Sequence, residues 1–280
     1  MKSFFKIFRY LVIGIIAIIL VSVGIDATDN YDNLSESIVG RIVFGEAEGP
    51  CSEGMVFVPN DNGGFCIDKY EASPGEECPS WFISSQLDTR DNLDFNECLP
   101  VSVAGARPWR FISQTQAMTA CAKAGKRLPN DEEWYQASLG TPDPDGDWQS
   151  DACQVDNNWT EQPGESGSAE NCVSSYGAYD MIGNVWEWVK AEINNGKLNG
   201  EEMPDAGYVS SVSSEGKIIS TAEKQDPNFN EDYLWIKKNG LRGMARGGYW
   251  GNGVEAGVYA MYLVSPTSFA GDGVGFRCVK

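Results

Sequence analysis

The apolar and polar positions change their pattern several times along the chain, and the first change marks the N-terminus. The opening residues read MKSFFKIFRYLVIGIIAIILVSVGIDA, in which an apolar run covers residues 10–25. Lys2, Lys6 and Arg9 precede this run, and an acidic stretch begins at Asp26 after it. Such a segment is typical of an exported protein, either as a signal peptide or as an uncleaved transmembrane helix.

We expect an uncleaved anchor, because residues 25–27 make a poor cleavage site. The basic residues ahead of the apolar run place the N-terminus inside the cell and the rest of the chain outside. The predicted organisation is a membrane anchor or signal segment over residues 1–27, a polar stalk over 28–49 and a folded domain over 50–280. The protein is therefore expected at the cell surface, or as a secreted protein if the first segment is cleaved.

Two helices have clear start and stop signals. They are expected over residues 113–124, which Gly125 closes at the C-terminus, and over residues 130–140. Each begins with the residue pair of a capping box, Ser113 with Gln116 and Asn130 with Glu133.

Strand patterns are shorter and fewer. MVFVPND and FCIDKYEAS predict two short strands joined by a turn at Gly63 and Gly64. Residues 141–175 and 190–240 are rich in Gly, Pro, Asp, Asn and Ser, and they are expected to form long loops.

Composition excludes several classes of function. The chain has 280 residues, of which 42% are hydrophobic and 9 are Trp, so it can bury a large core. Its 21 basic and 40 acidic residues give a net charge of −19, which repels phosphate backbones and argues against nucleic acid as a partner. The chain has no histidine, which removes the commonest general base and transition-metal ligand and excludes catalytic triads that use His.

Eight cysteines follow the apolar segment, and an even number fits an oxidising compartment. Sequence alone leaves the pairing open. Proximity in loop-like surroundings favours three local pairs and leaves two distant cysteines for each other: Cys51 with Cys66, Cys78 with Cys98, Cys153 with Cys172, and Cys121 with Cys278.

Three motifs carry a resemblance to a known family. In the order GKRLPNDEEWYQAS, GAYDMIGNVWEWV and RGGYW…GVGFRC, the chain resembles the formylglycine-generating enzyme (sulfatase-modifying factor) family over residues 51–280. The resemblance implies an irregular α+β domain of the C-type-lectin-like type, with sparse regular secondary structure. It also implies a disulfide between Cys121 and Cys278.

The stretch DMIGNVWEW predicts a structural calcium site. Asp180 and Glu187 offer carboxylate oxygens, while Gly183 and Val185 offer backbone carbonyls, and calcium prefers such an all-oxygen set. Family members look similar here, with calcium at the matching positions.

The alternative for this stretch is purely structural. Asp180 would cap a turn, the two Trp side chains would fill core, and Glu187 would pair with a base such as Arg246. Arg127 and Glu133, in the first motif, are likewise expected to brace the scaffold.

The resemblance does not extend to the family's chemistry. Its oxidase activity requires two copper-binding cysteines between the RGG strand and the terminal GFRC, and no cysteine lies between Gly247 and Arg277. A related branch, the ergothioneine-type sulfoxide synthases, holds iron with histidines, which this chain lacks. We therefore expect neither copper nor iron and no catalytic residues. The calcium-lectin signatures EPN and WND are also absent.

The last segment, RGGYWGNGVEAGVYAMYLVSPTSFAGDGVGFRC, spans residues 246–278 and mixes turn glycines with residues that follow no apolar period. It resembles the variable region of diversity-generating retroelement target proteins, which present a hypervariable binding surface on this fold. In such systems adenines of AAC codons are replaced at random. The candidate ligand-binding residues are all reachable from AAC: Tyr249, Gly251, Asn252, Val254, Tyr262, Val264, Ser265, Ser268, Phe269, Ala270, Gly271 and Asp272.

Other residues of the segment are expected to form a fixed scaffold. Trp250, Glu255 and Met261 cannot be reached from AAC, and they join the flanking Arg246, Gly247, Gly248, Gly275, Phe276, Arg277 and Cys278. Tyr, Phe, Ser, Gly, Asn and Asp are the residues of adaptable binding surfaces, although the aromatic residues could instead be ordinary core or surface residues.

The sequence thus predicts a surface-displayed, non-catalytic ligand-binding protein whose partner is a protein or another ligand on a cell or virus. The alternative is a catalytically silent relative, an oxidase relative or an enzyme with unrecognised chemistry.

Overall fold

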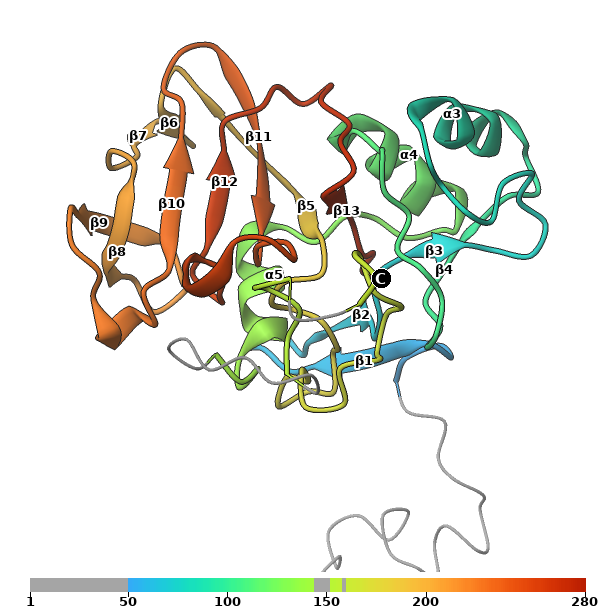
Figure 1. Ribbon diagram of the computed structural model, residues 1–280, viewed down its shortest axis with the longest axis horizontal. Coiled ribbons are helices and arrows are strands. Elements are labelled where there is room, and N and C mark those ends of the chain that lie inside the picture. The colour runs from blue at the N-terminus through green and yellow to red at the C-terminus, as the bar shows by residue number, and fades with distance from the viewer. Residues whose placement is uncertain (1–49, 144–151, 158–159) are drawn as a thin grey trace, which may run out of the picture. The chain divides into compact units, whose positions relative to one another are not determined.

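The computed structural model describes residues 50–143, 152–157 and 160–280 (Figure 1). The expected anchor over residues 1–27 and the stalk over 28–49 lie outside this part of the chain. Within the three described ranges, no helix has both the length and the apolar character needed to cross a bilayer.

A mixed nine-stranded sheet dominates the domain, in the order β7-β6-β5-β11-β12-β10-β8-β9 with β13 beside β5 (Figure 1). Most neighbours are antiparallel, but β12 runs parallel to β10 and β13 runs parallel to β5. Consequently the last two strands of the chain enter the sheet at separate places. The strands are β5 (Trp186–Asn194), β6 (Lys197–Leu198), β7 (Glu201–Glu202), β8 (Gly207–Val212), β9 (Ile218–Ala222), β10 (Tyr233–Ile236), β11 (Leu241–Arg246), β12 (Met261–Leu263) and β13 (Val274–Gly275).

Two small sheets accompany the main one. β1 (Met55–Val58) pairs antiparallel with β2 (Phe65–Asp68), and β3 (Ser73–Pro74) with β4 (Pro100–Val101). The predicted first hairpin is confirmed, although both strands end earlier than expected. Asn60 ends β1, because its side-chain oxygen accepts hydrogen bonds from the backbone of Asn62 and Gly64, both at 2.9 Å.

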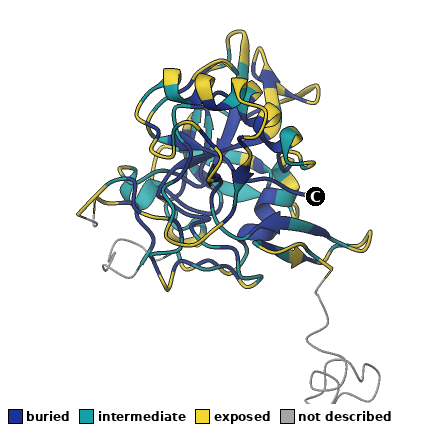
Figure 2. Ribbon diagram, turned by 90° about the vertical axis from the view of Figure 1, so that its right-hand side faces the viewer, coloured by how far each residue is buried: buried dark blue, intermediate teal, exposed yellow. Residues whose placement is uncertain are grey.

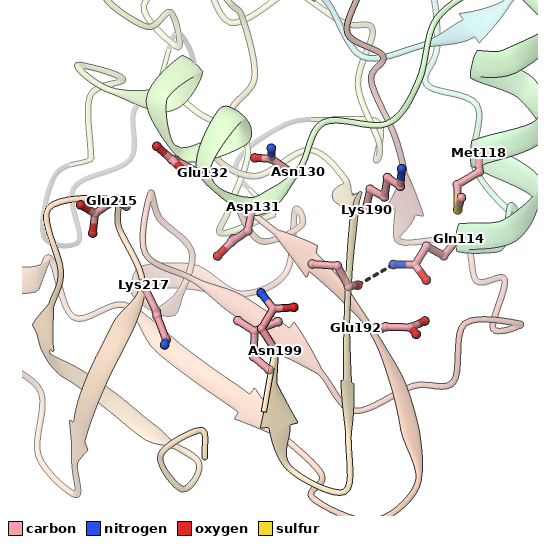
Figure 3. Close-up of a pocket in the computed structure, with 12 residues that line it drawn as sticks. Gln114, Met118, Asn130, Asp131, Glu132, Lys190, Glu192, Asn199, Glu215 and Lys217 are labelled. Carbon is pink, nitrogen blue, oxygen red and sulfur yellow. Dashed lines mark hydrogen bonds between the residues drawn. The ribbon is translucent and has the colours of Figure 1, made fainter. Parts of the chain in front are cut away.

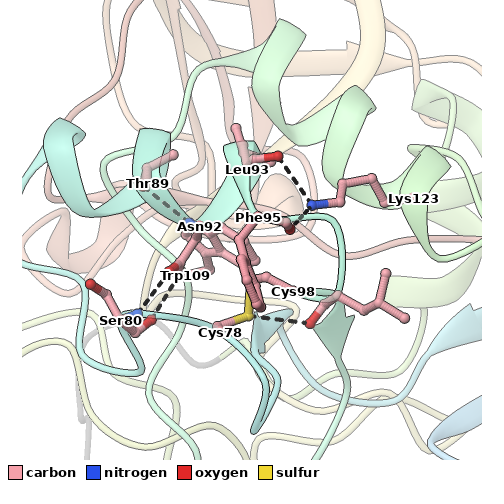
Figure 4. Close-up of a disulfide and its surroundings, with 10 residues drawn as sticks. Cys78, Ser80, Thr89, Asn92, Leu93, Phe95, Cys98, Trp109 and Lys123 are labelled. Carbon is pink, nitrogen blue, oxygen red and sulfur yellow. Dashed lines mark hydrogen bonds between the residues drawn. A yellow bond between two sulfur atoms is a disulfide. The ribbon is translucent and has the colours of Figure 1, made fainter.

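Both predicted helices are present, as α4 (Gln114–Lys123) and α5 (Asp131–Ser138), and both capping boxes form. A further helix, α3 (Gln86–Asp94), has no counterpart in the sequence prediction. The Cys78–Cys98 disulfide closes its loop, and Asn92 fixes it by exchanging two hydrogen bonds with the backbone of Ser80 (Figure 4). Its apolar residues are not gathered on one face, so the sequence has no helical hydrophobic period that would predict it.

The expectation of a long loop over residues 190–240 was wrong, because β6 to β10 lie there. The Asn and Gly residues that suggested a loop form tight hairpin turns instead. Asn195-Gly196 joins β5 to β6 and Asn199-Gly200 joins β6 to β7, with positive φ at all four residues. Two-residue turns of this kind favour Asn-Gly.

All four disulfide pairs favoured by the sequence are confirmed: Cys51–Cys66, Cys78–Cys98, Cys153–Cys172 and Cys121–Cys278. The last bond joins α4 to the end of the chain across 157 residues. The core includes the fully buried Trp109, Trp134 and Trp188. Figure 2 shows buried residues gathered in the interior and exposed ones along the outline of the domain. At the level of class, the expected α+β domain with few helices and four disulfides is confirmed.

Candidate functional site

The C-terminal segment is framed by residues that the sequence predicted to be fixed scaffold. Arg246, Phe276 and Arg277 are fully buried at its two ends. Gly247 and Gly248 have φ values of 91° and 92°. A Cβ at Gly248 would overlap the Ala256 side chain, so only glycine fits this turn.

Buried and accessible residues alternate along β12. Met261 and Leu263 are buried in the core, while Tyr262 and Val264 are half-buried on the other side. Successive side chains of a strand point to opposite faces. The position that AAC cannot reach, Met261, therefore faces the core, and its reachable neighbour Tyr262 faces outward.

A cleft of about 270 Å³ lies on this outer side. It includes five of the predicted ligand-binding residues: Tyr249, Tyr262, Phe269, Gly271 and Asp272. Trp186, Trp188, Gly273 and Val274 complete its lining. The ring of Tyr262 packs against Trp186 at a centroid distance of 5.7 Å, and its hydroxyl lies 2.7 Å from Ser265 Oγ. The cleft thus combines rings of the C-terminal segment with a tryptophan floor from β5.

Some candidate binding residues also have structural contacts. Asn252 Oδ1 accepts a hydrogen bond from the backbone of Tyr249 at 2.9 Å, which closes the turn after Gly248. Ala270 is buried and its carbonyl accepts from Gln86 Nε2 at 2.9 Å. Ser265 is also buried. The remaining candidates outside the cleft lining are half-buried or exposed: Gly251, Val254, Val264 and Ser268. The scaffold residues Trp250 and Glu255 are also half-buried.

Sequence reasoning missed the cleft residues that lie outside the C-terminal segment. Trp186 and Trp188 were interpreted only as core, although both line it. The backbone amide of Phe111 donates to the Gly271 carbonyl at 2.8 Å, so the chain at Phe111 lies against the C-terminal segment. Trp81, in the loop that the Cys78–Cys98 disulfide closes, is 77% exposed. An aromatic residue between these two cysteines was the available sequence signal.

A second and larger cavity, of about 650 Å³, lies between α4, α5 and β5 (Figure 3). Asp131, Asn199 and Lys217 surround the same space, together with acidic and basic neighbours. Burial raises the pKa of Asp131, while Arg246 and Lys217 oppose that shift. None of the predicted binding residues lines this cavity. We favour the smaller cleft as the functional site because its lining is aromatic and belongs to the C-terminal segment.

The DMIGNVWEW turn places Asp180 in the interior, with φ 56° and 1% of its surface exposed. Its Oδ2 accepts a hydrogen bond from the backbone of Gly167 at 2.6 Å. Its Oδ1 is buried and has no hydrogen-bond partner among the described residues. Burial raises the pKa of Asp180 to about 7. An orphaned carboxylate oxygen at this turn fits a cation ligand.

Glu187 has a different environment. Arg277 donates to both of its carboxylate oxygens at 2.6–2.9 Å, and Trp134 Nε1 donates to Oε2 at 2.7 Å. Because a guanidinium already occupies both oxygens, this carboxylate does not fit as a calcium ligand. Its partner is Arg277, not Arg246, which approaches Asp131 at 3.4 Å instead.

No group of three or more Asp, Glu, Cys or His side chains that could hold a metal occurs in the described part of the chain. Carbonyl oxygens would have to supply the remaining ligands beside Asp180. Calcium held by Asp180 with the carbonyls of Gly183 and Val185 therefore stays a prediction. The bracing role expected for Arg127 and Glu133 matches their two hydrogen bonds of 2.6 Å.

Comparison with known proteins identifies the family. Residues 60–280 match the Sulfatase-modifying factor enzyme 1-like domain. The chain belongs to this family. It is 32% identical over 101 residues to the inactive C-alpha-formylglycine-generating enzyme 2 of Bos taurus, a stretch that covers 30% of this chain and 33% of that protein. The family expected from the three motifs is confirmed.

Several solved structures resemble this family member more distantly. The Major Tropism Determinant P3c variant is 18% identical, with 82% of this chain and 53% of that chain covered and a TM-score of 0.40. Treponema denticola variable protein 1 is 14% identical, with 78% of this chain and 84% of that chain covered and the same TM-score of 0.40. Likenesses at these scores do not assign a function to the chain.

Proposed function

We propose that this member of the family is a non-catalytic ligand-binding protein and that the cleft residues of its C-terminal segment are the centre of the binding surface. The observation that carries the proposal is that Tyr249, Tyr262 and Phe269 line one cleft together with Trp186. Aromatic rings give large contact area with few rotatable bonds, and Gly and Asp beside them give adaptable polar contacts. This combination suits a surface that recognises another macromolecule.

We further propose that this surface is diversified by a retroelement. The support is a pair of neighbours on β12: Met261, which AAC cannot reach, is buried, and the AAC-reachable Tyr262 lines the cleft. Changes at outward positions alter the ligand contacts while the core packing stays intact. Diversity at Met261 would disturb the core, where loss of a large side chain destabilises by about 2–5 kcal/mol.

The absence of catalysis rests on the cysteines. The family's copper chemistry needs thiols, and all eight cysteines of this chain are paired in disulfides. A paired cysteine offers no thiolate for a metal. The protein is therefore proposed to bind its ligand and leave it unchanged.

The location of the domain and the kind of partner are proposed from the apolar N-terminal residues 1–27. An anchor over residues 1–27 would hold the domain outside the cell, where disulfides persist. The partner would then be a protein or another surface molecule of a cell or virus, and nucleic acid is disfavoured by the charge of −19.

A structural calcium at the Asp180 turn is part of the same proposal. Its support is the orphaned Asp180 Oδ1. A bound ion would raise the melting temperature by mass action. Elemental analysis of the purified chain and melting curves with and without chelator test it. An Asp180→Asn variant that still shows the same calcium content and the same chelator effect would contradict the assignment.

The binding proposal is tested with the detergent-solubilised full chain on beads, exposed to surface proteins of cells and viruses from its environment. A triple variant, Tyr249→Ala with Tyr262→Ala and Phe269→Ala, is expected to lose captured partners. A variant changed at the exposed Phe57, far from the segment in sequence, serves as the control and should keep them. Equal capture by the triple variant, or copper-dependent oxidation of a cysteine peptide by the wild-type chain, would favour the alternative functions.

A further inference from the structure

The turn that leads into β12 binds two carboxylates from distant parts of the chain. Gly257 and Ala260 close this turn through a backbone hydrogen bond of 3.1 Å. The amide of Val258 donates to Asp143 Oδ2 at 3.2 Å, and the amide of Tyr259 donates to Asp232 Oδ2 at 2.7 Å. Asp143 follows α5, and Asp232 immediately precedes β10. The fold therefore brings both carboxylates to one short backbone segment.

The two carboxylates lie against the bare backbone of Gly257. A Cβ built at Gly257 would overlap both Asp232 Oδ1 and Asp143 Oδ2, so the two side chains share the space that a larger residue would fill. Asp232 is fully buried. Its Oδ1 and the Oδ1 of Asp143 are both buried, and neither has a hydrogen-bond partner among the described residues. The Asn230 side chain also hydrogen-bonds to Asp143 and the Ala260 amide to Asp232, while both Oδ1 atoms stay without a partner in the described part of the chain.

The surrounding charges do not balance this pair. Arg246 donates to the Val258 carbonyl at 3.1 Å and lowers the pKa of Asp232, but it also faces Asp131 at 3.4 Å. This buried cation therefore faces two carboxylates, Asp131 and Asp232, and it does not act on Asp143. Burial raises the pKa of Asp143 to about 7 and that of Asp232 well above its ordinary value. Without another positive charge, the pair would hold a proton near neutral pH.

We propose that Asp143 and Asp232 bind one divalent cation of the calcium type through their two orphaned oxygens. Backbone amides already donate to the opposite oxygens, and such bonds favour the ionised form of a carboxylate. Hard carboxylate oxygens suit calcium, with water and backbone oxygens as its usual remaining ligands. The site shares no residue with the Asp180 turn.

The cation would fasten three separate segments to one another. These are the loop after α5, the loop before β10 and the turn before β12, which carries Tyr262. A ligand that binds only the folded arrangement stabilises it, and here it would stabilise the base of the C-terminal segment. This inference is independent of whether the outer surface binds a partner.

Calcium titration of the full chain by calorimetry tests the site. An Asp180→Asn background removes the other proposed calcium ligand while keeping an acceptor for Gly167. In this background we expect one calcium per chain. Adding Asp232→Asn should weaken binding at least about tenfold, because it removes a charged ligand but leaves an acceptor for the Tyr259 amide. Adding Asp94→Asn, at an exposed position, is the matched control and should bind normally.

Melting temperatures separate a cation from a shared proton. In chelator, Asp232→Asn should raise the melting temperature, since a neutral amide no longer has to be buried as a charge or take up a proton beside Asp143. At a calcium concentration near a hundred times the dissociation constant, the melting temperature of the parent chain should rise by about 5–10 °C. The Asp232→Asn variant should lack this rise. Absence of calcium binding by the folded Asp180→Asn chain would overturn the proposal. An equal gain from Asp232→Asn with and without calcium would overturn it as well and indicate a shared proton.

Discussion

The ring of Tyr262 packs on the ring of Trp186, with centroids 5.7 Å apart and planes inclined by 38°. Tyr262 belongs to the segment interpreted as variable, whereas Trp186 belongs to the GNVWEW motif of the family. The hydroxyl of Tyr262 is held at 2.7 Å by Ser265 Oγ. The Tyr262 side chain is therefore held by Trp186 and Ser265, and rigid aromatic residues make effective binding anchors.

Truncation of this anchor should weaken ligand binding. Tyr262→Ala is expected to cost about 1–3 kcal/mol of binding free energy, measured by calorimetry with a captured partner. Tyr262→Phe keeps the ring on Trp186 and loses only the bond to Ser265, so its loss should be smaller. Equal affinity of wild type and Tyr262→Ala would place the anchor elsewhere.

Disulfides that close short loops and the one that closes a long loop should differ in their contribution to stability. Cys121–Cys278 closes 157 residues and Cys51–Cys66 closes 15. Chain entropy predicts that replacing both cysteines by alanine loses about 3 kcal/mol for the short loop and roughly 5 kcal/mol for the long one. Denaturant unfolding of the two double variants measures the difference. A larger loss for the short loop would show that entropy of the unfolded chain does not dominate.

Removing the charge of Glu187 should strongly destabilise the domain. Glu187→Gln leaves Arg277 buried without its anion, and breaking such a pair typically loses about 3–5 kcal/mol. Glu202→Gln is the control, because the Lys197–Glu202 pair is exposed and is expected to contribute less than about 1 kcal/mol. Urea unfolding compares the two. Similar small losses would mean that Arg277 finds another partner.

The ion pair between the buried Asp68 and the half-buried Lys126, with Nζ and Oδ1 2.6 Å apart, should make stability depend on pH. Burial raises the pKa of Asp68 and Lys126 lowers it. Lys126→Met therefore raises this pKa further. A raised carboxyl pKa contributes stability that is present at low pH and lost as pH rises through the folded pKa.

The variant should thus lose roughly 3 kcal/mol near neutral pH and clearly less at about pH 4. Urea unfolding at both pH values measures this change. Lys224→Met, at an exposed position, should show no such trend. A loss for Lys126→Met that is independent of pH would indicate packing of its aliphatic chain as the cause.

Local signals made part of this structure predictable. The capping boxes of Ser113 and Asn130 act within one turn of helix, so the sequence reveals them. The hairpin turns at Asn195-Gly196 and Asn199-Gly200 were equally local, but they were interpreted as loop because their strands are very short. At these two positions the Asn-Gly pairs predict hairpin turns better than the overall composition predicts a loop.

Long-range pairing could not be derived in the same way. Glu187 meets Arg277 across 90 residues, and only the fold decides between Arg277 and Arg246 as its partner. The meeting of Asp143 with Asp232 at Gly257 depends on three loops at once. By contrast, side chains alternate along β12, so the outward direction of Tyr262 follows once the strand is known.

Sequencing the 3′ end of the gene in many members of one population, together with the neighbouring DNA, tests the central claim most directly. Diversification by a retroelement predicts a nearby reverse transcriptase and a near-copy of this end, with substitutions at positions such as Tyr249, Tyr262 and Phe269. It predicts none at Trp250, Glu255 and Met261. Substitutions spread evenly over both groups, with no near-copy beside the gene, would contradict it.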